Sequence, residues 1–297
     1  MNIVTTFEEA RAARRGVVAL VPTMGYFHEG HLSLIRAART GADTVLVSLF
    51  VNPLQFGEGE DLDRYPRDLD RDAALADDAG ADVLFAPAVE TMYPLEPATR
   101  VTVGSLTDHL CGAYRPGHFE GVATVVTKLF AGLQPDLAVF GRKDAQQLAV
   151  LRRLAIDLSF PVRVVGRPIV REQDGLALSS RNLYLSGEQR RSALALSRGL
   201  ARCALAALDG ERSGAALESI VRTECEQAPG VDVQYVQLVD AQTVQPIPEL
   251  DRDAFLAIAA HVGTTRLIDN VHFWLDGGKL TYELGERLDR ATILGGN

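Results

Sequence analysis

Cysteine is scarce in this sequence, and its pattern excludes two classes of site. The 297 residues contain three cysteines, Cys111, Cys203 and Cys225, an odd number without Cys-x-x-Cys spacing. Neither a disulfide framework nor a thiolate zinc site is therefore predicted. We expect reduced thiols, buried or partly buried, in a cytoplasmic protein.

Positive charge is also in short supply. Lysine and arginine number 30 against 39 aspartates and glutamates, which gives a formal charge of −9. This balance provides no general electrostatic footprint for nucleic acid, although a local basic pocket is compatible with it. Hydrophobic residues make up 47% and charged residues 23%, as in soluble globular proteins rather than disordered or membrane proteins.

Long apolar runs are missing as well. The stretch Val17–Pro22 follows Arg14 and Arg15 but is too short for the apolar part of a signal peptide. It is better interpreted as a buried strand. We expect no targeting segment, no transmembrane segment and no membrane partner.

What the sequence does contain, through its first half, is an alternation of short apolar runs with longer segments of helical periodicity. This rhythm predicts βα units on a parallel sheet of about five strands, with ligands at the carboxyl ends of the strands. The expected strands are Val17–Val21, Thr44–Val51, Val83–Ala86, Leu137–Phe140 and Val162–Val165, and the expected helices are His31–Arg39, Leu69–Ala79, Gly121–Leu133 and Ala145–Leu158.

The character of the chain changes after Asn182. An alanine-rich helix is expected over Gly187–Leu208 and another over Ala215–Gln227, followed by strand-like segments Val231–Val239 and Ala254–His261. We interpret this part as a second, smaller α/β domain, with domains at 1–184 and 185–297. The tail after Asn270 gives little periodic signal, and its role is not predicted.

The loop after the first expected strand reads Pro22-Thr23-Met24-Gly25-Tyr26-Phe27-His28-Glu29-Gly30-His31 and leads into a helix. Its glycines let backbone approach a ligand, and a helix N-terminus favours phosphate. His28 and His31 are three residues apart, so both rings are expected on one side of the first turn, as a phosphate clamp. Metal binding and a purely structural pair remain alternatives, although the spacing is not the i, i+4 of a zinc helix.

A turn with two neutral amides, Asn52 and Gln55, follows the next strand. Amides suit a substrate that carries hydroxyls and a carboxylate, but Asn before Pro also ends strands simply through turn chemistry. The acidic stretch Gly57–Leu69, which includes Glu58, Glu60, Asp61, Asp63 and Tyr65, is interpreted as a solvated loop or a lid, and the sequence alone favours the solvated loop.

Two further segments carry groups suited to phosphate. In Gly141-Arg142-Lys143-Asp144, Lys143 follows a strand and can neutralise phosphate charge, whereas Asp144 fits either a ligand role or a helix cap with Gln147. In Asp174–Asn182, two serines and Arg181 can hold a triphosphate, because the guanidinium offers fork geometry.

Taken in order, these motifs resemble the pantothenate synthetase family up to Asn270. The resemblance is carried by Pro22–His31, Val51–Phe56, Tyr65-Pro66-Arg67, Arg115-Pro116-Gly117-His118-Phe119, Phe140–Leu148, Asp174–Asn182 and Thr265–Asn270. That family consists of adenylate-forming enzymes with an H-x-G-H signature, here His28-Glu29-Gly30-His31. The resemblance implies a Rossmann-like doubly wound parallel sheet, a smaller C-terminal α/β domain that closes over the active site, and a homodimer.

The resemblance also implies roles for single residues. Catalysis falls to His31, His28, Lys143 and Arg181, pantoate binding to Gln55 and Gln147, and β-alanine binding to Gln55, while Asn52, Tyr65 and His118 match positions near the site. Arg142, where the family pattern has an acidic residue, and the bulky Tyr26-Phe27 pair are departures that bear on nucleotide affinity. ATP binding is implied for Pro22, Thr23, Met24, Gly25, Tyr26, Phe27, His28, Glu29, Gly30, His31, Gly141, Arg142, Lys143, Asp144, Val170, Leu178, Ser179, Ser180 and Arg181.

The activity implied is a two-step ligation: pantoate is activated by ATP as an acyl-adenylate, with Mg²⁺ held mainly by the ATP phosphates, and β-alanine then displaces AMP. Two rival readings remain open. One is a nucleotidyltransferase of the same superfamily that forms no amide, and the other is a non-catalytic nucleotide-binding module.

Overall fold

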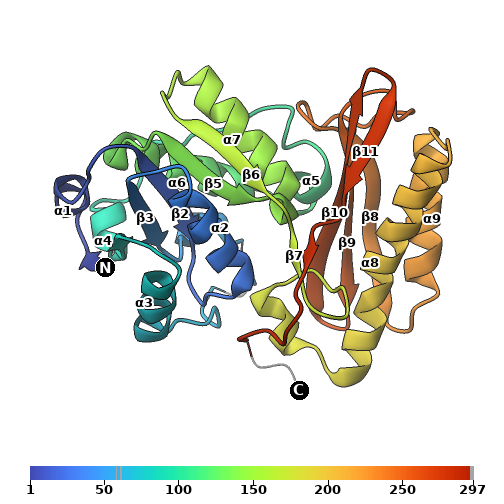
Figure 1. Cartoon of the computed structure of the whole chain (residues 1–297), viewed down its shortest axis with the longest axis horizontal. Coiled ribbons are helices and arrows are strands. Elements are labelled where there is room, and N and C mark those ends of the chain that lie inside the picture. The colour runs from blue at the N-terminus through green and yellow to red at the C-terminus, as the bar shows by residue number, and fades with distance from the viewer. Residues whose placement is uncertain (58, 61, 295–297) are drawn as a thin grey trace. The chain divides into compact units, whose positions relative to one another are not determined.

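Two compact units make up the chain in the computed structural model, which describes residues 1–57, 59–60 and 62–294 (Figure 1). The first unit comprises Met1–Thr107, Gly112–Gly141 and Val150–Arg167, and the second comprises Asp108–Cys111, Arg142–Ala149 and the chain from Pro168 onward. A single division after residue 184 remains a prediction. Glu58 and Asp61 of the expected lid, and residues 295–297 of the tail, lie outside the described residues.

The first unit is built on a six-stranded parallel sheet with the strand order β1-β4-β3-β2-β5-β6. It confirms the Rossmann-like class and all five expected strands. The sixth strand was not expected, because three residues at a sheet edge are too short to give a periodic signal. The strands are β1 Asn2–Val4, β2 Val18–Thr23, β3 Thr44–Leu49, β4 Val83–Phe85, β5 Leu137–Gly141 and β6 Arg163–Arg167.

The helices α1 to α7 connect or flank these strands (Figure 1). In α2 the buried residues Leu32, Ile35 and Ala38 recur every three positions and belong to one core cluster with Val21 and Val47 of the sheet. Apolar residues three or four positions apart are typical of a helix with one apolar face. The helices are α1 Phe7–Ala12, α2 Glu29–Arg39, α3 Leu69–Asp78, α4 Val89–Met92, α5 Leu110–Tyr114, α6 His118–Leu133 and α7 Ala145–Asp157.

The strand order determines where a ligand fits this sheet. From β2 the chain builds outward through β3 and β4 on one side, and later through β5 and β6 on the other. The order therefore reverses beside β2, and ligands of such sheets bind at the carboxyl ends of the strands at this point. The loop of Met24–His28 leaves β2 at that end, so the fold presents the expected phosphate loop at the switch point.

The second unit contains a four-stranded antiparallel sheet, ordered β11-β10-β9-β8, with the long helices α8 and α9 beside it (Figure 1). A short parallel pair joins β7 to β12. This unit matches the smaller α/β domain expected from the sequence. Its elements are β7 Val170–Arg171, α8 Gly187–Leu208, α9 Gly214–Glu226, β8 Val231–Asp240, β9 Ala254–Val262, β10 Thr265–Asp276, β11 Lys279–Glu283 and β12 Glu286–Arg287.

The tail that gave little periodic signal is regular in the structure. β10 runs through it to Asp276, and the turn Gly277-Gly278, with φ of +55° and +83°, leads into β11. Residues 269–273 are all buried, so the alternation of apolar and polar residues that reveals a strand is absent there. Two glycines with positive φ are typical of a tight hairpin turn.

Small side chains of α8 and α9 let these helices pack closely in the core of the second unit. Cys203 and Cys225 belong to this cluster and are fully buried, and burial raises the pKa of each thiol to about 12. All three cysteines are free, as the sequence predicted.

No helix within the described ranges has the length and apolar character needed to cross a membrane.

Candidate active site

The loop between β2 and α2 is shaped by the first turn of α3. Gly25 and Tyr26 have φ of +91° and +53°, so the chain passes through two left-handed residues before the helix. The buried carboxylate of Asp72 accepts the backbone N–H groups of Tyr26 at 2.5 Å and Phe27 at 2.7 Å. Arg71 donates to the carbonyl of Phe27 and lies 4.8 Å from the centre of the Tyr26 ring. The carboxylate of Asp72 thus supplies the hydrogen-bond acceptors that a neighbouring strand supplies to regular backbone.

These contacts account for the bulky pair Tyr26-Phe27. Phe27 is fully buried in the core beneath α2, and the ring of Tyr26 carries the guanidinium of Arg71 as a cation–π contact. Burial raises the pKa of Asp72, and the hydrogen bonds from Phe27 and Tyr26 and the charge of Arg71 only partly offset this. The role of Asp72 and Arg71 in the loop was not expected from the sequence. An acidic residue in the first turn of a helix is ordinarily explained by its favourable interaction with the helix N-terminus.

His28 and His31 lie together at the N-terminus of α2, with ring centroids 4.1 Å apart. His28 is the N-cap rather than a helical residue: its Nδ1 accepts the N–H of Gly30, while Nδ1 of His31 accepts the N–H of His28. Because Nδ1 is the acceptor in both rings, the proton of each neutral imidazole resides on Nε2. Both rings therefore present Nε2–H as a donor, which is the chemistry of a phosphate clamp.

Gly30 is required by this arrangement. A Cβ atom at position 30 would lie 2.8 Å from Cε1 and from Nδ1 of the His28 ring. Real Cβ atoms do not come this close to another heavy atom, so any other residue displaces the imidazole. The glycine of the H-x-G-H signature thus makes room for the first histidine to turn back onto its own helix.

The two amides after β3 differ in their roles. Asn52 is 1% exposed and caps the 3₁₀ turn Pro53–Gln55, where its side chain bonds to Gly121 O, Leu54 N–H and the hydroxyl of Tyr93. Burial raises the pKa of that tyrosine to about 12, which keeps its hydroxyl a donor. Asn52 therefore acts in the architecture of the turn, as the turn interpretation predicted.

Gln55 is held in place by its neighbours. Its Oε1 accepts from Asn52 at 3.2 Å, its Nε2 lies 2.8 Å from Sδ of Met24, and its backbone carbonyl contacts Nδ1 of His118 at 2.8 Å. Arg115 bonds to Nε2 of the same histidine ring. The side chain of Gln55, the predicted substrate amide, is therefore fixed beside Met24 of the β2–α2 loop.

Glu60, in the acidic stretch, pairs with Arg115 through two hydrogen bonds of 2.6 and 2.7 Å. Burial by itself would raise the pKa of Glu60, but the hydrogen bond and charge of Arg115, with the backbone N–H of Gly57 and the nearby His118, together lower it. Tyr65, 7% exposed, packs edge-on against Phe56 at 6.0 Å between ring centroids. Parts of the expected lid are thus tied to the first unit by an ion pair and an aromatic contact.

Within the second unit, Lys143 lies in the 3₁₀ turn Arg142–Asp144 that precedes α7. Asn270 of β10 donates to the backbone carbonyls of both Arg142 and Lys143, each at 2.9 Å. The Arg142 guanidinium pairs with Glu283 at 2.7 Å and lies 5.1 Å from the centre of the Trp274 ring. The departure at position 142 thus has an internal partner for its charge, and Asp144 is exposed.

The predicted segment Leu178–Arg181 follows a small hairpin in the same unit. Val170 accepts the N–H of Leu178 at 2.9 Å, and the Ser179 hydroxyl caps the 3₁₀ turn Ser180–Tyr184 by accepting the N–H of Arg181. Asn182 donates to Glu172 at 2.7 Å and to the carbonyl of Ala177. Arg190 of α8 bonds to Glu172 and Asp174, so the hairpin is held by side chains at both ends.

The predicted residues therefore form two groups. Pro22–His31, Asn52, Gln55, Tyr65, His118 and Gly141 belong to the first unit, whereas Arg142–Asp144, Gln147, Val170 and Leu178–Arg181 belong to the second. Within the first group, the structure shows two separate contacts: His28 lies against His31, and Gln55 lies against Met24. Sequence reasoning missed Asp72 and Arg71, and it named Arg115 and Asn270 only as parts of motifs, without the positioning contacts that the structure gives them.

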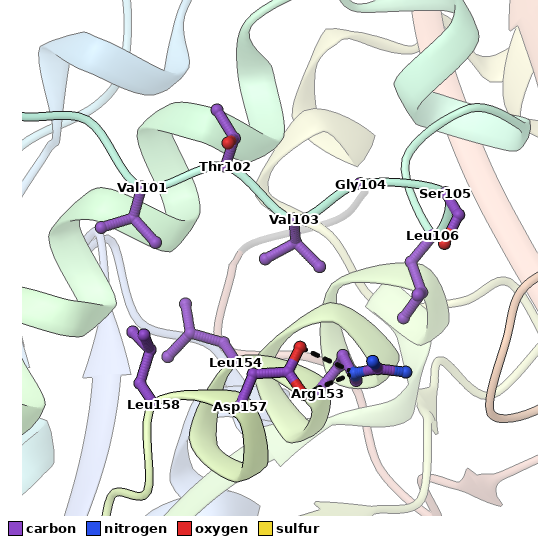
Figure 2. Close-up of a pocket in the computed structure, with 10 residues that line it drawn as sticks. All are labelled: Val101, Thr102, Val103, Gly104, Ser105, Leu106, Arg153, Leu154, Asp157 and Leu158. Carbon is purple, nitrogen blue, oxygen red and sulfur yellow. Dashed lines mark hydrogen bonds and ion pairs between the residues drawn. The ribbon is translucent and has the colours of Figure 1, made fainter.

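Two other features lie outside this set. A cavity of about 430 Å³ lies in the first unit. Figure 2 shows residues that line it: Val101 and Val103 point toward Leu154 and Leu158, beside the ion pair of Arg153 with Asp157. None of its lining residues is a predicted site residue. As for metal ions, no group of three or more His, Cys, Asp or Glu within the described part of the chain is arranged to hold one.

A doubly wound sheet with a histidine-bearing helix N-terminus at its switch point defines a nucleotide-binding enzyme of the Rossmann-like class. The model of the family Pantoate-beta-alanine ligase matches residues 2–272. The chain belongs to this family.

Relatives agree with the match. A pantothenate synthetase from Pelobacter propionicus is 52% identical over 276 residues, which cover 91% of this chain and 97% of the relative. A pantothenate synthetase from Heliobacterium modesticaldum is 55% identical over 264 residues, which cover 89% of this chain and 93% of the relative. The crystal structure of pantothenate synthetase from Thermus thermophilus superposes with a TM-score of 0.87 at 51% identity, covering 91% of this chain and 98% of that one. A pantoate-beta-alanine ligase from Francisella tularensis, solved in complex with beta-gamma ATP and beta-alanine, has a TM-score of 0.71 at 31% identity, with 91% and 97% covered.

Proposed function

We propose that this protein condenses pantoate with β-alanine at the expense of ATP, through a pantoyl-adenylate, and releases AMP and pyrophosphate. The observation that carries the proposal is the His28–His31 pair, whose Nε2–H groups are oriented by the backbone at the switch point of a ligase-family sheet. The Francisella relative, whose structure holds an ATP compound and β-alanine, supports the same substrates.

In the first step, a carboxylate oxygen of pantoate attacks the α-phosphorus of ATP, and the bond from that phosphorus to the bridging oxygen breaks to release pyrophosphate. A carboxylate is already ionised at neutral pH, so this step needs in-line alignment and neutralised phosphate charge rather than a strong base. His28 and His31 supply hydrogen-bond donors, and Lys143 and Arg181 supply positive charge. His31 is proposed as the residue that stabilises the charge developing in the transition state.

In the second step, the neutral amine of β-alanine attacks the acyl carbon, the bond to the AMP oxygen breaks, and the nitrogen loses a proton. Gln55 and Gln147 are proposed to bind pantoate, with Gln55 also near β-alanine, because amides recognise hydroxyls and carboxylates without adding charge. Since only the unprotonated amine reacts, the rate of this step should rise as the pH is raised above neutral.

Mg²⁺ is proposed to enter with ATP, held mainly by its phosphates, where it would neutralise charge on the leaving pyrophosphate.

The proposal also includes a homodimer in the cytoplasm and closure of the loops Gly57–Leu69 and Leu178–Asn182, with the C-terminal domain, over the labile adenylate. Light scattering measures the oligomeric state. Limited proteolysis tests closure: these loops should be protected by ATP with pantoate, and cleavage unchanged by the substrates would contradict it.

The decisive experiment measures AMP and pyrophosphate released by the purified protein with ATP, Mg²⁺ and pantoate, with and without β-alanine. AMP in step with pantothenate, only when every substrate is present, is the expected result. Pyrophosphate without AMP even with the amine would instead indicate a nucleotidyltransferase that forms no amide. Absence of turnover under all conditions would leave a nucleotide-binding module.

A further inference from the structure

The segment Thr265–Asn270 has no role in the mechanism above, yet it contains two of the most buried polar side chains in the second unit. Asp269 and Asn270 are adjacent in β10, and each is 2% exposed. Successive side chains of a strand point to opposite faces, so the two residues reach different segments. Their own link is the N–H of Asn270, which donates to Oδ1 of Asp269 at 2.8 Å.

Asn270 reaches the turn that carries Lys143. Both hydrogens of its side-chain amide are used, one on the carbonyl of Arg142 and one on that of Lys143, each at 2.9 Å. These two carbonyl oxygens identify the amide atom that faces them as Nδ2, because Oδ1 in that place would repel both of them. Oδ1 is then one of several buried side-chain atoms without a hydrogen-bond partner among the described residues.

Asp269 reaches the hairpin that leads to Arg181. Its two oxygens accept from both terminal nitrogens of Arg171, at 2.7 and 2.9 Å, in a pair that is almost wholly buried. Arg171 donates in turn to the carbonyl of Gly175, and the neighbouring Val170 accepts the N–H of Leu178. The hairpin that precedes Ser179–Arg181 is therefore anchored to the same point of β10.

On the basis of the proposed function, we infer that Asn270 and Asp269 are positioning residues for ATP, which hold the backbone of Lys143 and the hairpin before Arg181 from two adjacent places on one strand. Neither residue supplies charge to the phosphates. A flexible lysine or arginine loses entropy when it binds phosphate, and fixing its backbone beforehand reduces this cost. A displacement of about 1 Å at such a group can lower the rate on the order of 10²-fold.

A double-mutant cycle with Lys143 tests the inference. Asn270→Leu removes both donors at similar volume, and Asn270→Ser keeps one short hydroxyl in case the leucine variant does not fold. Two readouts are measured for each variant: affinity for a non-hydrolysable ATP analogue by calorimetry, and pantoate-dependent exchange of pyrophosphate into ATP. Asp253→Ala is the matched control, because Asp253 also accepts a backbone N–H of β10, from Leu275, but touches neither segment.

We expect Asn270→Leu to lower both readouts by about 10- to 100-fold and Asn270→Ser by less, with the control unchanged. Combined with Lys143→Ala, Asn270→Leu should add little, because groups that act as a unit are non-additive. The same cycle with Arg171→Met/Asp269→Leu, which leaves no unpaired buried charge, and Arg181→Ala should also be non-additive. The inference would be overturned if Asn270→Leu kept wild-type affinity and exchange. It would also be overturned if Asn270→Leu lowered both readouts by the same factor in the Lys143→Ala background as in the wild type. A wild-type protein that binds the analogue but makes no pantothenate would refute the proposed function, while the affinity cycle would still decide on Asn270.

Discussion

The carboxylate of Asp72 accepts the backbone N–H of Phe27 at 2.7 Å and so ties the first turn of α3 to the loop that presents the two histidines. Asparagine at position 72 keeps the shape but replaces one acceptor oxygen with a donor, which then faces the N–H of Tyr26 or Phe27. We expect Asp72→Asn to raise KM for ATP about tenfold or more, with a smaller change in KM for β-alanine. Steady-state kinetics with each substrate varied in turn measure this, and equal changes in both KM values would speak against a role in the phosphate loop.

The same residue should make stability depend on pH. Burial raises the pKa of Asp72 above its usual value, while Arg71 opposes the shift and Asp68 adds to it. Between the unfolded and folded pKa values the folded protein binds more protons, so its stability falls as pH rises through that window and levels off above it. The free energy of unfolding of the wild type, relative to Asp72→Asn, should therefore decline from about pH 4 upward. Urea unfolding at a series of pH values measures this difference, and a constant difference would contradict the prediction.

Gly30→Ala should disable the site while sparing the fold. The added methyl would lie 2.8 Å from two atoms of the His28 ring, so the ring must swing away and lose its hydrogen bond from residue 30. We expect AMP release to fall on the order of 10²-fold, with a melting temperature within a few degrees of the wild type. Gly104→Ala is the matched control, because a Cβ there meets no atom within 4 Å. Activity in Gly30→Ala equal to that of the control would show that the ring position does not matter.

His31→Ala removes one donor from the proposed phosphate clamp. By analogy with the loss of a single oxyanion-hole donor, the rate of adenylate formation should fall by about 10²–10³. Pyrophosphate exchange isolates this step from the reaction with the amine. His261→Ala, in β9 and outside the predicted site, should retain full exchange. A loss of less than about tenfold in His31→Ala would shift the main role to Lys143 and Arg181.

Asp269→Asn should be one of the most destabilising single changes in the second unit. It leaves the guanidinium of Arg171, 6% exposed at its side chain, without a compensating charge. Breaking such a buried pair typically costs about 3–5 kcal/mol, whereas replacing both members by apolar residues can be nearly neutral. Denaturant unfolding should therefore find Arg171→Met/Asp269→Leu more stable than Asp269→Asn alone. A double variant no more stable than the single one would indicate that the pair itself is essential to folding.

The sequence by itself determined the class of fold, most of its elements and the residues of the predicted site. Periodicity located α8 and the strands β2 to β6, because long helices and buried strands carry strong local patterns. The H-x-G-H signature identified the histidine pair, because the spacing is short and its geometry is local.

Only the tertiary structure decided what holds those residues. Asp72 lies more than 40 residues from the loop that it fixes, and Asn270 lies more than 120 residues from the turn of Lys143. The strands β10 and β1 also escaped prediction. Burial of residues 269–273 erases the alternation in β10, and the three residues of β1 are too few to show a period. Contacts between distant segments depend on strand order and burial, which no local pattern encodes, and within each unit these contacts hold the backbone that carries the predicted residues.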